Sequence, residues 1–242
     1  MKNLSIIEQL SNASNGAFRA ELEGKPVIFK PNHLERELWD FPTGTLVFRE
    51  RATFLMSEFL GWNLVPNTEL ISTDHGVGSI QDWVTGECTL VDIIPSVEIS
   101  SPWLSVLEGQ NESGLPVSLV HQDDEILKRI ALLDVLVNNA DRKGGHLLTD
   151  EAGKTSGIDH GVTFHPEPKL RTVLWGWAGQ PIPEGLLQDV RSLPEDLSET
   201  ELGELLTEEE IDATHQRIAE LVNIGKFPTP SQAWPSLPWP LF

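Results

Sequence analysis

A polar run behind an apolar helical segment carries the strongest chemical signal in the sequence. Apolar residues recur at helical spacing over 126–137, and Asp141, Arg142 and Lys143 follow, with two glycines directly after them. A carboxylate at the mouth of such a loop can accept a proton from an attacking hydroxyl group. Glycine lets the backbone approach a ligand closely. The same residue types are common in surface turns, so the motif by itself leaves both interpretations open.

A second candidate lies in the sequence Ile158-Asp159-His160-Gly161. An apolar strand that ends in Asp and then Gly can present a carboxylate to a divalent cation. Mg²⁺ prefers a few carboxylates together with phosphate oxygens and water. A tight turn after a strand is the alternative interpretation.

The third candidate is Lys30, at the end of an apolar strand. A cation that emerges from a hydrophobic strand is costly unless it is paired or bound to an anion. Glu50, on the helix predicted to follow, is the better candidate partner, and Glu58 is the weaker one.

Taken together, these residues follow the order of the kinase catalytic set: strand Lys, helix Glu, linker strand, loop Asp, then strand Asp. In this respect the sequence resembles the phosphatidylinositol 3-/4-kinase superfamily, and most closely its type II phosphatidylinositol 4-kinase-like branch of small actinobacterial-type proteins. The resemblance covers roughly residues 16–183. The residues that carry it are Phe29-Lys30-Pro31, Arg49-Glu50-Arg51-Ala52, 133–142, 158–164 and Trp175-Gly176-Trp177.

The resemblance implies ATP and Mg²⁺ or Mn²⁺ as cofactors and an ATP-dependent phosphotransferase, a kinase, as the activity. Lys30 would contact the nucleotide phosphates, and Glu50 would hold Lys30. The segment formed by Gln81, Asp82, Trp83 and Val84 would be the hinge beside the adenine, with Trp83 as its apolar or stacking neighbour.

The resemblance also assigns the residues of the reaction itself. Asp141 would be the catalytic base, with Arg142 and Lys143 as the cations beside the transferred group, and Asp159 would bind the metal. His146 stands where the family usually has an asparagine metal ligand, and neutral imidazole suits Zn²⁺ or Mn²⁺ as readily as Mg²⁺. The acceptor is left open.

Two features keep alternative functions open. The segment Ser14-Asn15-Gly16-Ala17 holds one glycine where protein kinases have three, and it belongs to a turn-rich stretch, 11–16, that could cover a ligand. Together with His146, this leaves a pseudokinase that binds nucleotide or protein as one alternative. The other is a nucleotidyl transferase, because similar cleft residues serve either reaction, depending on how the nucleotide is oriented.

The fold expected from the resemblance is a two-lobed protein-kinase-like α+β fold, with a small antiparallel-sheet N-lobe and a mainly helical C-lobe. The expected parts are an N-lobe over 1–84, a C-lobe over 85–226 and a Pro- and Trp-rich tail over 227–242, which favours an extended strap. Local patterns predict strands at 17–22, 26–31, 65–71, 79–84 and 146–148. They predict helices at 46–60 (ended by Gly61), from Asp123 or Asp124 to about 138, and within 184–222. They also predict a helical piece near 103–107 and a polar loop at 109–114.

Composition limits the partners. The 242 residues include 37 acidic and 17 basic side chains, a net charge of −20. This argues against nucleic acid and against an anionic membrane as docking surfaces. Residues 184–220 hold 12 acidic and 2 basic side chains, so half of the net charge lies there, on a solvated face or, as the alternative, on a surface that binds a protein partner. A single cysteine and an N-terminus that lacks an apolar signal segment favour a cytoplasmic protein.

Overall fold

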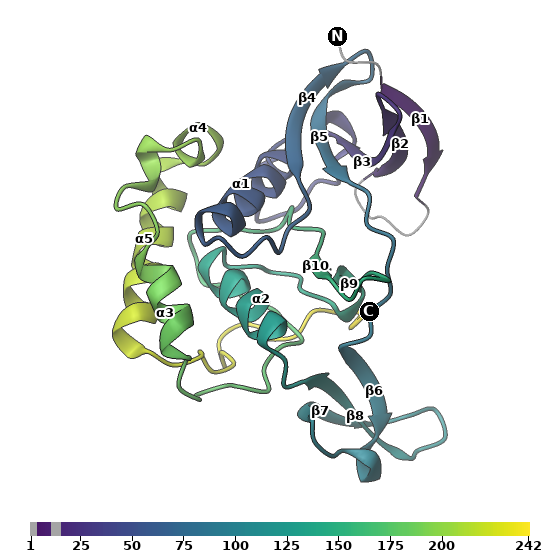
Figure 1. The fold of residues 1–242 in the computed structure, drawn as a ribbon, viewed down its shortest axis with the longest axis vertical. Helices are drawn as coiled ribbons and strands as arrows, with labels where there is room; N and C mark the ends of the chain where they lie inside the picture. Colours follow the sequence, from purple (N-terminus) through teal and green to yellow (C-terminus); the bar gives the residue numbers. More distant parts are fainter. Residues whose placement is uncertain (1–3, 11–15) are drawn as a thin grey trace.

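The computed structural model describes residues 4–10 and 16–242, and its N-terminal part is a five-stranded antiparallel sheet (Figure 1). In space the strand order is β1-β2-β3-β5-β4. The strands are β1 (Leu4–Gln9), β2 (Phe18–Leu22), β3 (Lys25–Pro31), β4 (Thr68–Thr73) and β5 (Gly76–Asp82). The strands predicted at 17–22 and 26–31 are confirmed as β2 and β3, which pair with each other, whereas β1 has no counterpart among the predicted strands. Residues 11–15, which include Ser14 and Asn15 of the segment with the single glycine, lie outside the described residues.

The side chains of β3 alternate between the two faces of the sheet, and this alternation decides where Lys30 points. Val27 and Phe29 are buried in a small core with residues of the neighbouring strands, among them Ala20 and Ile80. Successive side chains of a strand point to opposite faces. Lys30 therefore points away from this core, on the face opposite to Phe29.

Helix α1 (Leu46–Phe59) packs against β4 and β5 (Figure 1). It ends as predicted, because Gly61 adopts φ +67° and its N–H donates to the carbonyl of Glu58 at 2.9 Å. This left-handed conformation suits glycine and satisfies a carbonyl of the last turn. The ordered end fixes the register of α1, and with it the position of Glu50.

Residues 91–122 form a second sheet, so the prediction of a helical piece near 103–107 is wrong. This sheet is antiparallel and three-stranded, in the order β6-β8-β7. The strands are β6 (Val91–Pro95), β7 (Trp103–Gln110) and β8 (Pro116–Gln122). A register shift between Ser105 and Leu107 breaks the strand alternation of β7. The predicted polar loop is shorter than expected, since 109 and 110 belong to β7.

Helices are the main regular elements of the remaining part, residues 123–242. The four helices are α2 (Glu125–Leu136), α3 (Glu184–Arg191), α4 (Leu202–Leu205) and α5 (Glu208–Ile224). Between α2 and α3 lie the short 3-10 helix η3 (Gly144–His146) and the short strands β9 (Leu147–Thr149) and β10 (Thr155–Gly157). The other 3-10 helices of the described chain are η1 (Asn32–Leu34), η2 (Ser96–Glu98) and η4 (Leu197–Glu199). Asp124 caps α2 by accepting from the Ile126 N–H at 2.7 Å.

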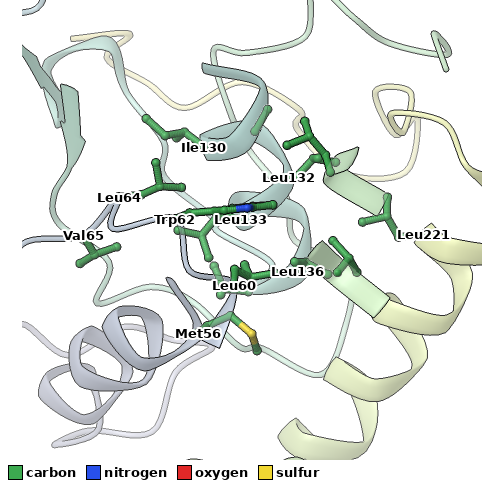
Figure 2. Packing of buried hydrophobic residues seen from close by; sticks show 14 of the residues in the cluster. Met56, Leu60, Trp62, Leu64, Val65, Ile130, Leu132, Leu133, Leu136 and Leu221 are labelled. Carbon is green, nitrogen blue, oxygen red and sulfur yellow. The ribbon is translucent and has the colours of Figure 1, made fainter. Parts of the chain in front are cut away.

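One large core joins the two parts. Met56 of α1, Leu133 and Leu136 of α2 and Leu221 of α5 belong to the same buried cluster (Figure 2). Because α1 carries Glu50 and α2 leads into the loop of Asp141, this core fixes the two relative to each other. Within the described residues, no helix combines the length and apolarity needed to cross a membrane.

The C-terminal segment is extended, as predicted. Residues 227–242 contain no helix or strand, and they run across the helical part to end beside β9 (Figure 1). The Gly144 N–H donates to the carbonyl of Leu241 at 2.8 Å, and the Thr172 N–H donates to that of Ser236 at 3.1 Å. The three part boundaries, at 84, 226 and 242, stay predictions.

Candidate functional site

Lys30 stands between two carboxylates that come from distant parts of the chain. Its Nζ donates to Oε1 of Glu50 on α1 and, at 2.7 Å, to Oδ1 of Asp159, two residues after β10. The Glu50 side chain is buried, that of Lys30 is 18% exposed and that of Asp159 is 43% exposed. Glu58, the weaker candidate partner, lines a different cavity. The structure thus brings together Lys30, Glu50 and Asp159, which the sequence analysis singled out separately.

The two carboxylates set the charge state of this cluster. Burial alone lowers the pKa of the Lys30 ammonium, but Asp159 and Glu50 outweigh it and raise that pKa above its ordinary value. The attraction of Lys30 lowers the pKa of Asp159, against the opposing effect of burial. Both groups are therefore charged at neutral pH.

The backbone around Asp159 is held in an uncommon conformation. Asp159 has φ +59°, in the left-handed region, which costs a residue with a side chain about 1–2 kcal/mol. The Ile158 N–H donates to the carbonyl of His146 at 2.9 Å, and the His160 N–H donates to Oε2 of Glu50 at 3.1 Å. Glu50 thus fixes both Lys30 and the segment that presents Asp159. Strained backbone of this kind clusters at functional sites.

Asp141 and Lys143 lie together at the end of the loop after α2. Lys143 Nζ is 3.2 Å from Oδ2 of Asp141, and the Asp141 N–H donates to Oδ1 of Asn139 at 3.0 Å. Burial raises the pKa of Asp141, and Lys143 opposes that shift. A carboxylate with a raised pKa is a stronger proton acceptor than an ordinary aspartate, which suits a general base.

Arg142 lies behind the loop in the core. Its Nη2 and Nε each donate to Asp134 at 2.9 Å, to Oδ1 and Oδ2 respectively, and neither side chain is exposed. The guanidinium also donates to the carbonyl of Ile158 at 3.1 Å and to Nε2 of His160 at 2.6 Å. Arg142 therefore ties the loop of Asp141 to the segment of Asp159. This arrangement positions both loops.

His146 lies beside Asp159, with Nε2 at 3.5 Å from Oδ2. Burial lowers the pKa of His146 to about 4, so its ring is neutral at pH 7. Its Nδ1 is buried and makes no hydrogen bond to any described residue. In the described part of the chain, no group of three or more His, Cys, Asp or Glu side chains could hold a metal ion. A metal at Asp159 and His146 would thus need oxygens from a ligand to complete its coordination.

The predicted hinge comprises the end of β5 and the start of the segment that leads to β6, and its residues are less closely tied to this cluster. Gln81 is buried and donates to Oγ1 of Thr68 at 2.8 Å, inside the sheet. Asp82, Trp83 and Val84 line a cavity of about 610 Å³. Among the described residues, none of the four makes a hydrogen bond or ion pair with Lys30 or Asp159.

A second cavity, of about 420 Å³, contains Asp141, Lys143 and Asp159 in its wall. Sequence reasoning missed the rest of this wall. Residues that it did not place in the site include Arg36, Trp39, Arg171, Trp234 and Trp239. The exposed aromatic residue before α1 and the Trp-rich tail were visible in the sequence, but nothing in the sequence pairs them with Asp141. The site is therefore larger than the kinase-like motifs.

Comparisons with known proteins find a relative of nearly the same length, several proteins that match part of the chain, and a solved structure with a similar fold. No protein-family model matches the chain. Protein Rv2133c of Mycobacterium tuberculosis (strain ATCC 25618 / H37Rv) is 41% identical over 258 residues, which span 99% of this chain and 92% of that protein.

The partial likeness is to plant enzymes. Phosphatidylinositol 4-kinase gamma 7 of Arabidopsis thaliana is 30% identical over 166 residues, and phosphatidylinositol 4-kinase gamma 6 is 29% identical over 170. The matches span 62% of this chain but only 24% and 26% of the plant proteins. They indicate a kinase-like protein without assigning the chain to one branch of lipid kinases.

The fold likeness is to a crystal structure of the Helicobacter pylori proinflammatory kinase CtkA, with a TM-score of 0.51 and 12% identity over 93% of this chain and 95% of that one. At this identity the match concerns the fold alone, and it confirms the predicted two-lobed kinase-like α+β architecture. The near full-length similarity to Protein Rv2133c decides the family: the chain belongs to the family of Protein Rv2133c, and it has a kinase-like fold.

Proposed function

We propose that the protein is an ATP- and divalent-metal-dependent phosphotransferase. The observation that carries this proposal is the position of Lys30, which contacts a helix carboxylate, Glu50, and a loop carboxylate, Asp159. In kinases, a strand Lys paired with a helix Glu orients the nucleotide phosphates, and a loop Asp holds the metal. Assignment to the type II phosphatidylinositol 4-kinase-like branch stays a prediction.

Asp159 and His146 are the residues that would hold Mg²⁺ or Mn²⁺. Carboxylate oxygen and neutral imidazole nitrogen are both donors that Mn²⁺ accepts, and Mg²⁺ accepts the carboxylate with phosphate oxygens and water. When bound, the metal neutralises phosphate charge and draws electron density from the transferred phosphorus. Lys30 would exchange part of its contact with Asp159 for the nucleotide phosphates, while Glu50 keeps its ammonium in place.

Asp141 would act on the acceptor. As the acceptor oxygen forms a bond to the γ-phosphorus, the bond from that phosphorus to the bridging oxygen of ADP breaks, and the acceptor proton moves to Asp141. Lys143, at 3.2 Å from Asp141, supplies positive charge beside the transferred group. Gln81, with the segment 82–84, would line the adenine side.

The first experiment distinguishes this function from its alternatives. Purified protein is incubated with ATP labelled at either the γ- or the α-phosphorus, with Mg²⁺ or Mn²⁺, in the presence of a lysate metabolite extract. Label from the γ-position alone in a product supports the kinase. Transfer of α-label supports nucleotidyl transfer. Nucleotide binding without either product supports the pseudokinase, and it contradicts the proposal.

Two variants test the assigned roles. Asp159→Asn should abolish metal-dependent nucleotide binding, whereas Asp141→Asn should retain binding and lose about 10²- to 10⁴-fold in transfer rate, the range for a general base. Asp212→Asn, at an exposed aspartate of α5, is the matched control and should leave both quantities unchanged. Wild-type transfer in both site variants would contradict the assignment.

A further inference from the structure

The cavity beside Asp141 is walled by three segments that are distant in the sequence. They are the loop before α1 (residues 35–45), the segment after Asp159 (161–172) and the C-terminal strap (227–242), and they join the loop of Asp141 and Lys143 in the wall. The cavity has a volume of about 420 Å³. Small-molecule sites commonly enclose 300–1,000 Å³. The position of Asp141 in the wall makes this cavity the natural place for the acceptor, so the inference below rests on the proposed function.

A buried lysine clamps the three walls together. Lys169 Nζ lies 4.7 Å from the ring centre of Trp39 and 4.3 Å from that of Trp234, and it is 3.0 Å from Oδ2 of Asp40. Its side chain is only 3% exposed. Cation–π contacts are worth more when the cation is desolvated. The strap is also bound to the loop of Asp141 through the hydrogen bond from Gly144 to Leu241. This clamp makes the cavity a bounded pocket, whereas a polypeptide acceptor would need an open groove.

The wall contains two arginines that form no close ion pair with a described carboxylate, although Arg171 attracts the Asp141 carboxylate and so opposes the rise in the pKa of that group. Arg171 Nε donates to the carbonyl of Ala140 at 2.6 Å, which holds its guanidinium next to Asp141. Neither Arg171 nor Arg36 is within ion-pair distance of any described carboxylate. This is notable in a chain where acidic side chains outnumber basic ones by 37 to 17. By contrast, Asp141 in the same wall already has Lys143 as its ion-pair partner.

We propose that this cavity binds the phosphoryl acceptor, and that the acceptor is a small water-soluble hydroxyl compound that carries a phosphate or carboxylate group. A guanidinium is a planar donor that binds these anions with two parallel hydrogen bonds. Arg171 and Arg36 would bind the anionic group, and its hydroxyl would face Asp141. The faces of Trp39 and Trp239, which are 83% and 82% exposed, would cover the carbon skeleton.

The test measures anion binding and does not depend on catalysis. Inorganic phosphate is titrated into the full chain by isothermal titration calorimetry at constant ionic strength. Wild type should bind it, and Arg171→Gln and Arg36→Gln should each weaken binding by about tenfold or more, as expected for loss of a charge-assisted hydrogen bond. Lys226→Gln is the matched control, since Lys226 is an exposed cation that forms no ion pair with described residues and lines neither of the two cavities. It should leave the affinity unchanged.

Folding and alternative sources of the anion are controlled separately. Arg36 is exposed, so its variant tests the site even if Arg171→Gln unfolds; thermal unfolding monitors both. Glycerol 3-phosphate should compete with inorganic phosphate. Vesicles of phosphatidylcholine and phosphatidylserine should not bind in an Arg36-dependent way. If they do, the acceptor group belongs to a lipid surface and the water-soluble assignment is overturned.

The failures of the two proposals are distinguishable. The acceptor site is overturned if phosphate does not bind, or if its binding is lost in Lys30→Met and unchanged in Arg36→Gln and Arg171→Gln. In either case, label transfer from ATP can still support the phosphotransferase. Arg36- and Arg171-dependent phosphate binding without any label transfer supports the anion site and contradicts the phosphotransferase.

Discussion

Replacing Asp134 with alanine tests the buried ion pair that supports the site. Asp134, near the end of α2, accepts from Nε and Nη2 of Arg142, both at 2.9 Å, and from Nδ2 of Asn139 at 2.9 Å. Neither charged side chain is exposed. Asp134→Ala leaves the Arg142 guanidinium buried without a counter-charge. Breaking a buried pair in this way costs about 3–5 kcal/mol, a large fraction of the roughly 5–15 kcal/mol by which a domain is stable.

The measurement is the free energy of unfolding from urea titration, with circular dichroism and tryptophan fluorescence as parallel probes. Glu184→Ala is the matched control, because the pair of Glu184 and Arg191 is exposed and should contribute only about 0–1 kcal/mol. The double variant Asp134→Ala/Arg142→Met should recover part of the loss, since it removes the uncompensated charge. A loss for Asp134→Ala no larger than that for Glu184→Ala would refute the reasoning.

Three further predictions follow from the same site. Gly78→Ala should destabilise β3 and weaken ATP binding, because the added methyl group would lie 2.4 Å from the carbonyl of Lys30. In the control Gly109→Ala the methyl group meets no atom within 4 Å and should be neutral, and urea unfolding compares the stability of the two variants. Lys30→Met should weaken ATP binding roughly 10- to 150-fold by calorimetry, and equal affinity would contradict its role. Burial lowers the pKa of His146 to about 4 and also lowers that of His160, so the unfolded chain binds more protons than the folded chain below about pH 6.5. Stability should therefore be full above that pH and fall toward pH 4 by about 1.4 kcal/mol per pH unit for each imidazole. A flat profile of stability against pH, measured by urea unfolding, would contradict this.

Local patterns were sufficient wherever short-range physics dominates. The apolar spacing of α1 and α2, the capping Asp124 and the left-handed Gly61 each depend on neighbours within one or two helical turns. The order of Lys30, helix carboxylate and loop aspartates along the chain likewise indicated a kinase-like fold before any contact was known.

Patterns failed where pairing is between distant segments. The strand β7 has no clear two-residue period, because a register shift interrupts it, and only its ladder with β8 makes it a strand. The edge strand β1 holds two adjacent isoleucines and lacks a strict alternation of apolar and polar residues, so its sequence carries no clear strand period. Both elements depend on a partner strand that sequence alone does not identify.

The site divides in the same way. The amino-acid sequence alone shows which residue types are available for the chemistry: a strand lysine, a helix glutamate and two loop aspartates in kinase order. The folded chain is needed to see that Arg142 supports the loop from inside the core, and that the C-terminal strap and Arg171 complete the cavity beside Asp141. The reason is physical: burial and the packing of segments up to two hundred residues apart set these roles, and neither quantity is encoded in local spacing.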